Sequence, residues 1–184
     1  MTPSRMLRFL QRPQASYMAA PHRVQIGFLA GVNLPLPRPA LRTALSTAVR
    51  LTLRKHATPS SKHLSVMLGT NKQMQEFNFQ FAKLNVPTDV LSFPAEPAAA
   101  DGYLGDIVIS VEKAAVQAVA HDRTVIAELQ LLAIHGALHL LGYDHATKVE
   151  RSAMWAVQDE IVAALAPATA SRKNQRNSKR LPAA

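Results

Sequence analysis

The sequence predicts one globular domain that combines strands with helices and is flanked by two basic tails. A length of 184 residues, 48% of them hydrophobic, suits a single domain with an apolar core. Between residues 24 and 165, segments with strand-like patterns are followed by segments with helical periodicity. One predicted helix, over about 124–141, is apolar nearly all round, which is typical of a central buried helix.

Four segments predict strands, and turn residues separate them from the helices. The first two alternate apolar and polar residues, and Pro94 ends the third and begins a loop that continues to Gly102. The fourth contains Leu-Gly-Asp-Ile-Val-Ile, which is typical of a strand buried on both faces. The predicted strands cover residues 24–30, 63–68, 89–93 and 103–110.

Start signals predict five helices. Two capping-box patterns, a threonine followed three residues later by Gln or Glu, mark helix starts at Thr70 and Thr147. Pro39 suits the first turn of an earlier helix, and Ser110 can cap a short one. The predicted helices cover 38–56, a segment after Thr70, 110–120, 124–141 and a segment from Thr147 to Leu165.

Charge is spread unevenly along the chain, which carries a net charge of +9. Residues 1–75 hold eleven Lys and Arg and no acid, whereas all twelve acids lie between Glu76 and Glu160. Residues 166–184 are again basic. A basic balance of this size favours a polyanionic partner such as RNA.

We interpret residues 1–22 and 166–184 as disordered basic extensions of a domain that covers 23–165. For the first extension, an organelle presequence and a misassigned start with Met18 as the true one stay open. The chain has no cysteine, which excludes disulfides and thiolate metal sites and fits a reducing cytoplasm. No apolar run is long enough for a transmembrane helix, so we expect no membrane partner.

The segment from His135 to His145 reads His-Gly-Ala-Leu-His-Leu-Leu-Gly-Tyr-Asp-His and holds three of the seven histidines. His135 and His139 lie four residues apart, so they project from one face of the predicted helix. Gly142 can end this helix in a left-handed conformation, which can turn His145 back toward the other two. Three neutral imidazoles around a divalent ion leave a fourth position for water, as in a catalytic zinc site.

Two histidines on an apolar helix need polar partners, because an unpaired buried polar group costs about 1–3 kcal/mol. Hydrogen bonds within the core are the simpler explanation for a single histidine, but three histidines at these positions favour a metal. Gly136 inside the helix costs about 1 kcal/mol relative to alanine, which indicates that backbone or ligand passes close to it. The predicted catalytic group is then a metal-bound water and not a particular side chain.

The same spacing occurs in metzincin proteases, whose pattern is His-Glu-x-x-His-x-x-Gly-x-x-His. Gly136 stands where those proteases carry the glutamate that acts as general base. The ligand set therefore resembles that of a zinc hydrolase, while the missing carboxylate argues against a peptidase. A phosphodiester is a better target, because a metal can activate water and offset the charge on phosphate oxygens.

The segment 135–145 resembles the signature of the YbeY family of bacterial rRNA-maturation endoribonucleases. Two further segments are similar to the family's motifs, namely Pro-Thr-Asp-Val-Leu-Ser-Phe-Pro at 87–94 and Leu-Gly-Asp-Ile-Val-Ile-Ser at 104–110. The resemblance implies a zincin-like α+β fold, with a four-stranded mixed sheet packed with helices around a central buried helix. It also implies one zinc ion per chain, held by the three histidines of the signature.

The activity that the resemblance implies is single-strand-specific cleavage of RNA in 16S rRNA 3′-end maturation and ribosome quality control. The implied partners are single-stranded RNA, the 16S rRNA precursor, the small ribosomal subunit and its assembly factors, in the cytoplasm. Two other functions stay open. One is a zinc metallopeptidase-like hydrolase, and the other is a non-catalytic ribosome-assembly factor that contains zinc.

Further residues are candidates for supporting roles. The family usually carries an arginine, to which the resemblance assigns an RNA contact, at the position of Ala82. Another basic side chain can take over that contact. The candidates are Lys83, Arg54 and Lys55. Asp89 and Asp144 are candidates to accept N–H bonds from metal-ligating histidines, with turn or cap chemistry as the alternative.

Overall fold

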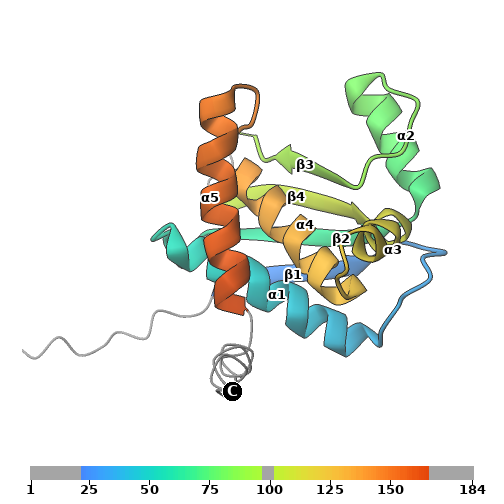
Figure 1. Cartoon of the computed structure of the whole chain (residues 1–184), viewed down its shortest axis with the longest axis horizontal. Coiled ribbons are helices and arrows are strands. Elements are labelled where there is room, and N and C mark those ends of the chain that lie inside the picture. The colour runs from blue at the N-terminus through green and yellow to red at the C-terminus, as the bar shows by residue number, and fades with distance from the viewer. Residues whose placement is uncertain (1–21, 97–101, 166–184) are drawn as a thin grey trace, which may run out of the picture.

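The computed structural model describes residues 22–96 and 102–165 of the 184-residue chain. Four strands and five helices are present within these residues (Figure 1). They are β1 (Val24–Phe28), α1 (Arg38–Lys55), β2 (His63–Gly69), α2 (Asn71–Ala82), β3 (Val90–Pro94), β4 (Tyr103–Ser110), α3 (Val111–Ala120), α4 (Val125–Leu140) and α5 (Lys148–Leu165). Every predicted element is confirmed, and the predicted bounds agree with these to within two residues.

Both predicted tails lie outside the described residues except for His22, and so do residues 97–101 of the predicted loop after Pro94. His22 is only 6% exposed, and its Nε2 lies 2.9 Å from the carbonyl oxygen of Thr58. His22 therefore packs against the domain that we predicted to begin one residue later.

The four strands form one mixed sheet in the order β1-β2-β4-β3. β2 is parallel to both of its neighbours, β1 and β4, while β3 pairs antiparallel with β4 and forms one edge. A parallel pair needs a crossover connection, and α1 supplies it between β1 and β2. The mixed four-stranded sheet that the family resemblance implied is confirmed.

One face of the sheet carries the main apolar core. Leu64 and Leu68 of β2 and Ile107 of β4 are fully buried, because alternate side chains of a strand point to the same face. Helices α1 and α4 pack on this face and add buried leucines such as Leu45 and Leu129 to the same cluster. The core therefore lies between the sheet and these two helices.

Helix α4 is the central helix of the domain. The side chain of Thr124 caps its N-terminus by accepting a hydrogen bond from the backbone N–H of Ala127 at 3.2 Å. The helix contacts α1, α3, α5, β3 and β4, and half of its 16 residues are buried. The predicted central buried helix is confirmed.

Gly136 lets α4 approach the sheet closely. A Cβ atom added here would lie 2.7 Å from Cγ2 of Ile107 and 3.0 Å from Oγ of Ser92. The Ser92 hydroxyl also donates a hydrogen bond to the Gly136 carbonyl oxygen at 3.2 Å. We predicted that backbone or ligand passes close to this glycine, but the groups that lie close to it are the side chains of Ser92 in β3 and Ile107 in β4.

Local hydrogen bonds explain where two other helices begin. Thr70 and Gln73 form the predicted capping box, with the Thr70 side chain bonded to the Gln73 backbone and the Gln73 side chain bonded to the Thr70 backbone. Thr147 and Glu150 form the second box, with bonds of 2.9 and 3.2 Å.

None of the described helices is long and apolar enough to cross a membrane.

The opposite face of the sheet packs against α2. Met67 of β2 and Val108 of β4 point to this face, because their neighbours along each strand belong to the core. Phe77 and Phe81 of α2 lie against them around a cavity. Phe81 is 60% exposed.

Candidate metal centre

The chain turns sharply where α4 ends. Gly142 follows the helix with a φ of +91°, in the left-handed region that favours glycine. The backbone N–H groups of Gly142 and Tyr143 donate to the carbonyl oxygens of His139 and Leu138 at 2.9 and 3.0 Å. These bonds close the last turn of the helix, and the following residues bring His145 back toward it. The predicted glycine turn is confirmed.

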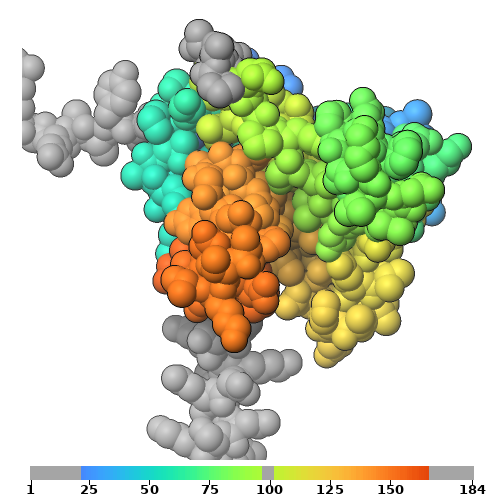
Figure 2. Space-filling model, turned by 90° about the horizontal axis from the view of Figure 1, so that it is seen from above, coloured from blue at the N-terminus to red at the C-terminus, as the bar shows by residue number. Residues whose placement is uncertain are grey.

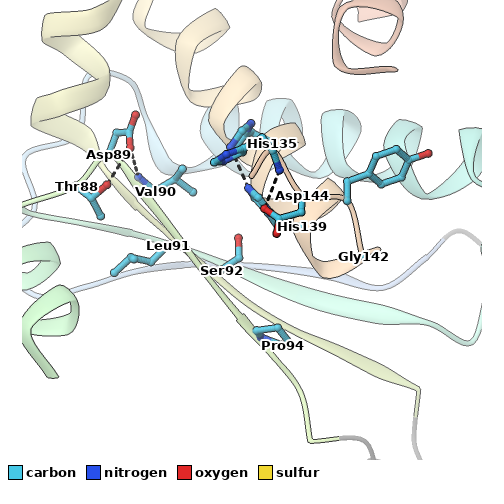
Figure 3. Close-up of a pocket in the computed structure, with 12 residues that line it drawn as sticks. Thr88, Asp89, Val90, Leu91, Ser92, Pro94, His135, His139, Gly142 and Asp144 are labelled. Atoms are coloured by element: carbon cyan, nitrogen blue, oxygen red, sulfur yellow. Dashed lines mark hydrogen bonds between the residues drawn. The ribbon is translucent and has the colours of Figure 1, made fainter. Parts of the chain in front are cut away.

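The turn gathers three histidine side chains at the C-terminal end of α4, where Figure 3 shows His135 and His139 side by side. One ring nitrogen from each of His135, His139 and His145 lies within 4.8 Å of the other two. The Nε2 atoms of His135 and His139 are 3.2 Å apart. Two nitrogens bound to one tetrahedral zinc ion, each at about 2.0–2.1 Å, are separated by about 3.3 Å. The geometry therefore fits one cation held by all three rings.

Hydrogen bonds orient two of the rings and leave nitrogens for the metal. Nδ1 of His135 lies 3.0 Å from Oε1 of Gln158 in α5, so Nδ1–H donates to the amide and Nε2 keeps its lone pair. The ring of His139 hydrogen bonds with the backbone of Tyr143. Sequence reasoning missed Gln158. Gln158 interrupts the apolar stripe of α5, and this interruption could have identified it.

The surroundings of the cluster favour neutral imidazoles. Burial and the neighbouring histidine charges together lower the pKa of His135 below its ordinary value of 6.5, although the Gln158 hydrogen bond raises it. Burial also lowers the pKa of His139, and the charge of His145 adds to this effect. A histidine must be neutral to bind a metal, so lowered pKa values favour metal binding near neutral pH.

An open cleft of about 650 Å³ lies beside the three histidines. One wall is the end of α4 with the turn at 142–145, and the other is β3 with the two residues before it (Figure 3). Three imidazoles bound to one divalent ion leave a coordination position open, and here the rings line the cleft. The arrangement suits hydrolysis of a substrate that lies along β3.

Strand β3 offers backbone groups to the cleft. The carbonyl oxygen of Asp89 accepts from the Ser110 N–H at 2.8 Å, and the Ala95 N–H donates to Leu104 O at 3.0 Å. Odd-numbered residues of β3 therefore direct their backbone groups toward β4. The backbone N–H and C=O of Ser92 consequently face the outer edge of the sheet.

Comparison with known proteins identifies the family. The chain matches the family described as Endoribonuclease YbeY over residues 33–166. The chain belongs to the YbeY family of endoribonucleases. The predicted enzyme class, a hydrolase that acts on RNA, is confirmed by this membership.

Two relatives and one solved structure illustrate the match. An Endoribonuclease YbeY from Acholeplasma laidlawii is 42% identical over 55% of this chain and 73% of its own length. An Endoribonuclease YbeY from Carboxydothermus hydrogenoformans is 39% identical over 68% of this chain and 86% of its own. The solution structure of a Thermotoga maritima protein matches with a TM-score of 0.55 and 23% identity, over 88% of this chain and 99% of that one. The zincin-like α+β fold is confirmed.

The position of Gly136 separates this YbeY-family site from that of a zinc peptidase. The peptidase pattern needs a glutamate here, but a side chain at this position would run into Ile107 and Ser92. The packing of α4 on the sheet therefore leaves no room for that general base. This contact is the physical reason why the glutamate is absent, and that absence is the sequence argument against a peptidase.

Asp89 lines the cleft of the YbeY-family site through hydrogen bonds of its own. Its carboxylate accepts from the Thr88 hydroxyl at 3.1 Å, the Val90 N–H at 2.9 Å and the Gln117 side-chain amide at 2.8 Å. Burial raises the pKa of Asp89, but these hydrogen bonds outweigh it and hold the pKa below its ordinary value. The ionised carboxylate acts on His135 through its charge, which raises the pKa of that histidine.

Asp144 has a similar role at the other end of the cleft. Its carboxylate accepts a hydrogen bond from the backbone N–H of His145 at 2.7 Å, and its charge raises the pKa of His139. Among the described residues, no hydrogen bond joins Asp144 or Asp89 to a histidine ring. Their hydrogen bonds to neighbouring residues are of the kind expected for the alternative, turn chemistry, while the ring of His135 contacts Gln158.

The three basic candidates lie away from the cleft. Lys83 ends α2 in a left-handed conformation with a φ of +62°, and its Nζ donates to the Gln80 carbonyl oxygen at 3.2 Å. Lys55 pairs with Glu160 of α5 at 3.0 Å, and Arg54 is exposed on α1. No Lys or Arg of the described ranges lines the cleft.

Proposed function

We propose that this chain is a zinc-dependent endoribonuclease that cleaves single-stranded RNA. The observation that carries the proposal is a trio of histidines beside an open cleft, in a chain of the YbeY family. One zinc ion per chain is held by His135, His139 and His145. A set of three neutral imidazoles suits zinc and leaves a position for the reaction.

The residues of the cleft have distinct tasks in this proposal. When bound, the metal ion polarises a phosphoryl oxygen and lowers the pKa of a water molecule. Gln158 and the Tyr143 backbone hold two imidazoles in their orientation. The outer edge of β3 offers the backbone N–H of Ser92 to a phosphate oxygen. A single strand can follow this edge with its bases splayed, whereas a duplex keeps its bases paired.

The proposed biological substrate is the 16S rRNA precursor at its 3′ end, in maturation and ribosome quality control. The proposed partners are the small ribosomal subunit and its assembly factors in the cytoplasm. The net charge of +9 supports a polyanionic partner. Phosphate contacts release counterions, so binding to RNA weakens as the salt concentration rises.

The test compares one RNA sequence in single-stranded and duplex form, with zinc-loaded and metal-stripped protein. We expect cleavage of the single strand only, dependent on zinc, and absent in His139→Ala. Val119→Ala, which changes an 82% exposed residue of α3, is the control and retains activity. Cleavage that continues without metal or in His139→Ala would refute the proposal.

A second candidate function is a non-catalytic, zinc-containing ribosome-assembly factor. The observation that favours it is the lack of a described Lys or Arg along the cleft, together with Ala82 at the family's usual arginine position. A zinc-bound protein that sediments with 30S particles but leaves single-stranded RNA intact would support this candidate. A casein assay tests the remaining peptidase alternative, and we expect no hydrolysis.

A further inference from the structure

A second cavity, of about 370 Å³, lies directly beside the metal centre. It is formed by the start of β3 with α3, α4 and α5, and it shares Asp89, Val90 and His135 with the cleft. Figure 2 shows the surface hollowed between the orange segment that contains α5 and the yellow segment that contains α3. We call it the side cavity. Its volume lies within the range of about 300–1,000 Å³ that is usual for ligand pockets.

The side cavity exposes the one tryptophan of the chain. Trp155 of α5 lines it and is 50% exposed, so one face of a large aromatic ring is open to the cavity. Gln158 follows on the same side of α5 three residues later and bonds to His135. The Arg151 guanidinium carbon lies 5.7 Å from the centre of the Trp155 ring. An aromatic surface with an adjacent cation therefore stands next to the metal centre.

Hydrogen-bonding groups of both kinds line the side cavity, since His121 and Gln158 lie in its wall together with Asp89. The Gln117 amide donates to the Asp89 carboxylate, which fixes the orientation of the Gln117 side chain. Glu128, only 2% exposed, pairs with Arg123 at 3.0 Å. An aromatic surface beside an acidic acceptor and polar side chains suits a flat ring that carries N–H groups.

We propose that the side cavity binds one nucleobase of the RNA strand whose phosphate lies at the metal centre. The base stacks on Trp155, and its N–H edge lies toward Asp89 and Gln117, which line the same cavity. Bases stack on aromatic side chains and carry N–H donors on the edges that pair in a duplex. A paired base cannot present that edge. The inference rests on the proposed function and supplies a structural reason for its preference for single-stranded RNA.

Tryptophan fluorescence tests the inference directly, because Trp155 is the sole tryptophan. Wild-type protein is mixed rapidly with an unlabelled single-stranded oligoribonucleotide or its duplex, and emission is recorded before cleavage proceeds. Anisotropy of the same oligoribonucleotide carrying a fluorophore measures binding separately. We expect the single strand to quench Trp155 and the duplex to leave it unchanged. Binding of the single strand without any change in emission overturns the inference.

Variants of Trp155 provide the second measurement. Trp155→Ala should weaken single-strand binding by roughly five- to 150-fold, which is the loss of one base–aromatic stack, and Trp155→Phe should retain most of the affinity. Val149→Ala, at an 80% exposed position of the same helix, is the matched control and should bind as the wild type does. Binding by Trp155→Ala that equals the wild type overturns the inference. Failure of the proposed function looks different, since then the wild type leaves the single strand uncleaved whether or not Trp155 emission changes.

Discussion

The two halves of α4 share one helix but do different work. The first half carries Leu129 and Leu132 into the core against the sheet and α1. The second half also buries apolar side chains, such as Ile134 and Leu138, and in addition carries His135 and His139, which stand beside an open cleft. The comparison shows that a helix that contributes to the core along its whole length can carry a reactive site at one end.

The apolar residues and the histidines of α4 contribute free energies of opposite sign. Burial of a leucine such as Leu129 stabilises the fold by about 1.5–3 kcal/mol. The histidines lose solvation on folding, which is the main cause of their lowered pKa values. Gly136 costs a further ~1 kcal/mol in helix propensity. The apolar residues of both halves therefore stabilise the domain, and the metal site in the second half reduces that stability.

The largest expected effect follows loss of a ligand from the second half. His139→Ala should reduce RNA cleavage by about a thousandfold or more, because the metal contributes several kcal/mol to transition-state stabilisation. The free energy of unfolding of the metal-free protein should change little or rise. Cleavage rates and urea unfolding measure the two quantities. A variant that unfolds while wild type remains folded would contradict the division of tasks.

The converse experiment removes a core side chain from the first half. Leu129→Ala should lower the free energy of unfolding by about 2–5 kcal/mol, because the side chain is fully buried and leaves a cavity. Metal content and cleavage rate per folded molecule should stay at wild-type values. Urea titration and elemental analysis check both. A fall in metal content at full folding would show that the halves are not independent.

Gln158 should matter for the metal and little for the core. Gln158→Leu removes the acceptor of the His135 Nδ1–H and should weaken metal affinity by about 10–100-fold. Gln158→Glu keeps an acceptor and should retain the affinity. Competition with a chelator measures both variants. If Gln158→Leu and the wild type bind the metal with equal affinity, Gln158 does not contribute to metal binding.

Gly136 lies between His135 and His139 and tests how closely α4 packs on the sheet. Gly136→Ala gains about 1 kcal/mol of helix propensity, but its Cβ meets Ile107 and Ser92, and such overpacking costs about 1–3 kcal/mol. We expect a net loss of stability in urea unfolding together with a lower cleavage rate. An increase in stability would mean that β3 and β4 can move away from α4 at little cost.

The smallest effect concerns pH. The folded pKa values of His135 and His139 lie below 6.5, so the unfolded chain binds protons first as the pH falls. The metal-free protein should keep its full stability above pH 6.5 and lose part of it below that value. Metal affinity should fall over the same range. In His139→Ala the pH dependence of urea unfolding should be smaller, and an unchanged dependence would assign it to other groups.

Local features of the structure could be predicted from the residues themselves and the mixed sheet from the family resemblance, but side-chain contacts between distant elements could not. The capping boxes, the Gly142 turn and the histidine cluster depend on residues within eleven positions of one another, so periodicity and spacing predict them. The contacts of Gln158 with His135 and of Gln117 with Asp89 join separate elements. Such pairs depend on how the elements pack, which spacing along the chain does not encode.

The three basic candidate residues also show that the sequence does not predict contacts between distant elements. Lys83 follows α2 directly in sequence, but its left-handed backbone turns the chain there, and its Nζ bonds to the carbonyl oxygen of Gln80. Lys55 belongs to a basic helix face, but α5 brings Glu160 to it. The number of basic residues predicted a polyanionic partner, but it did not predict which lysine or arginine side chains contact that partner.

X-ray absorption at the zinc edge, together with elemental analysis of zinc-loaded protein, tests the central claim most directly. We predict one zinc per chain, with imidazole nitrogens from His135, His139 and His145 at about 2.0–2.1 Å. We also predict that His139→Ala loses the bound zinc. A zinc-supplemented wild type that retains no metal, or a His139→Ala variant that keeps the same spectrum and stoichiometry, would contradict the assignment of the site.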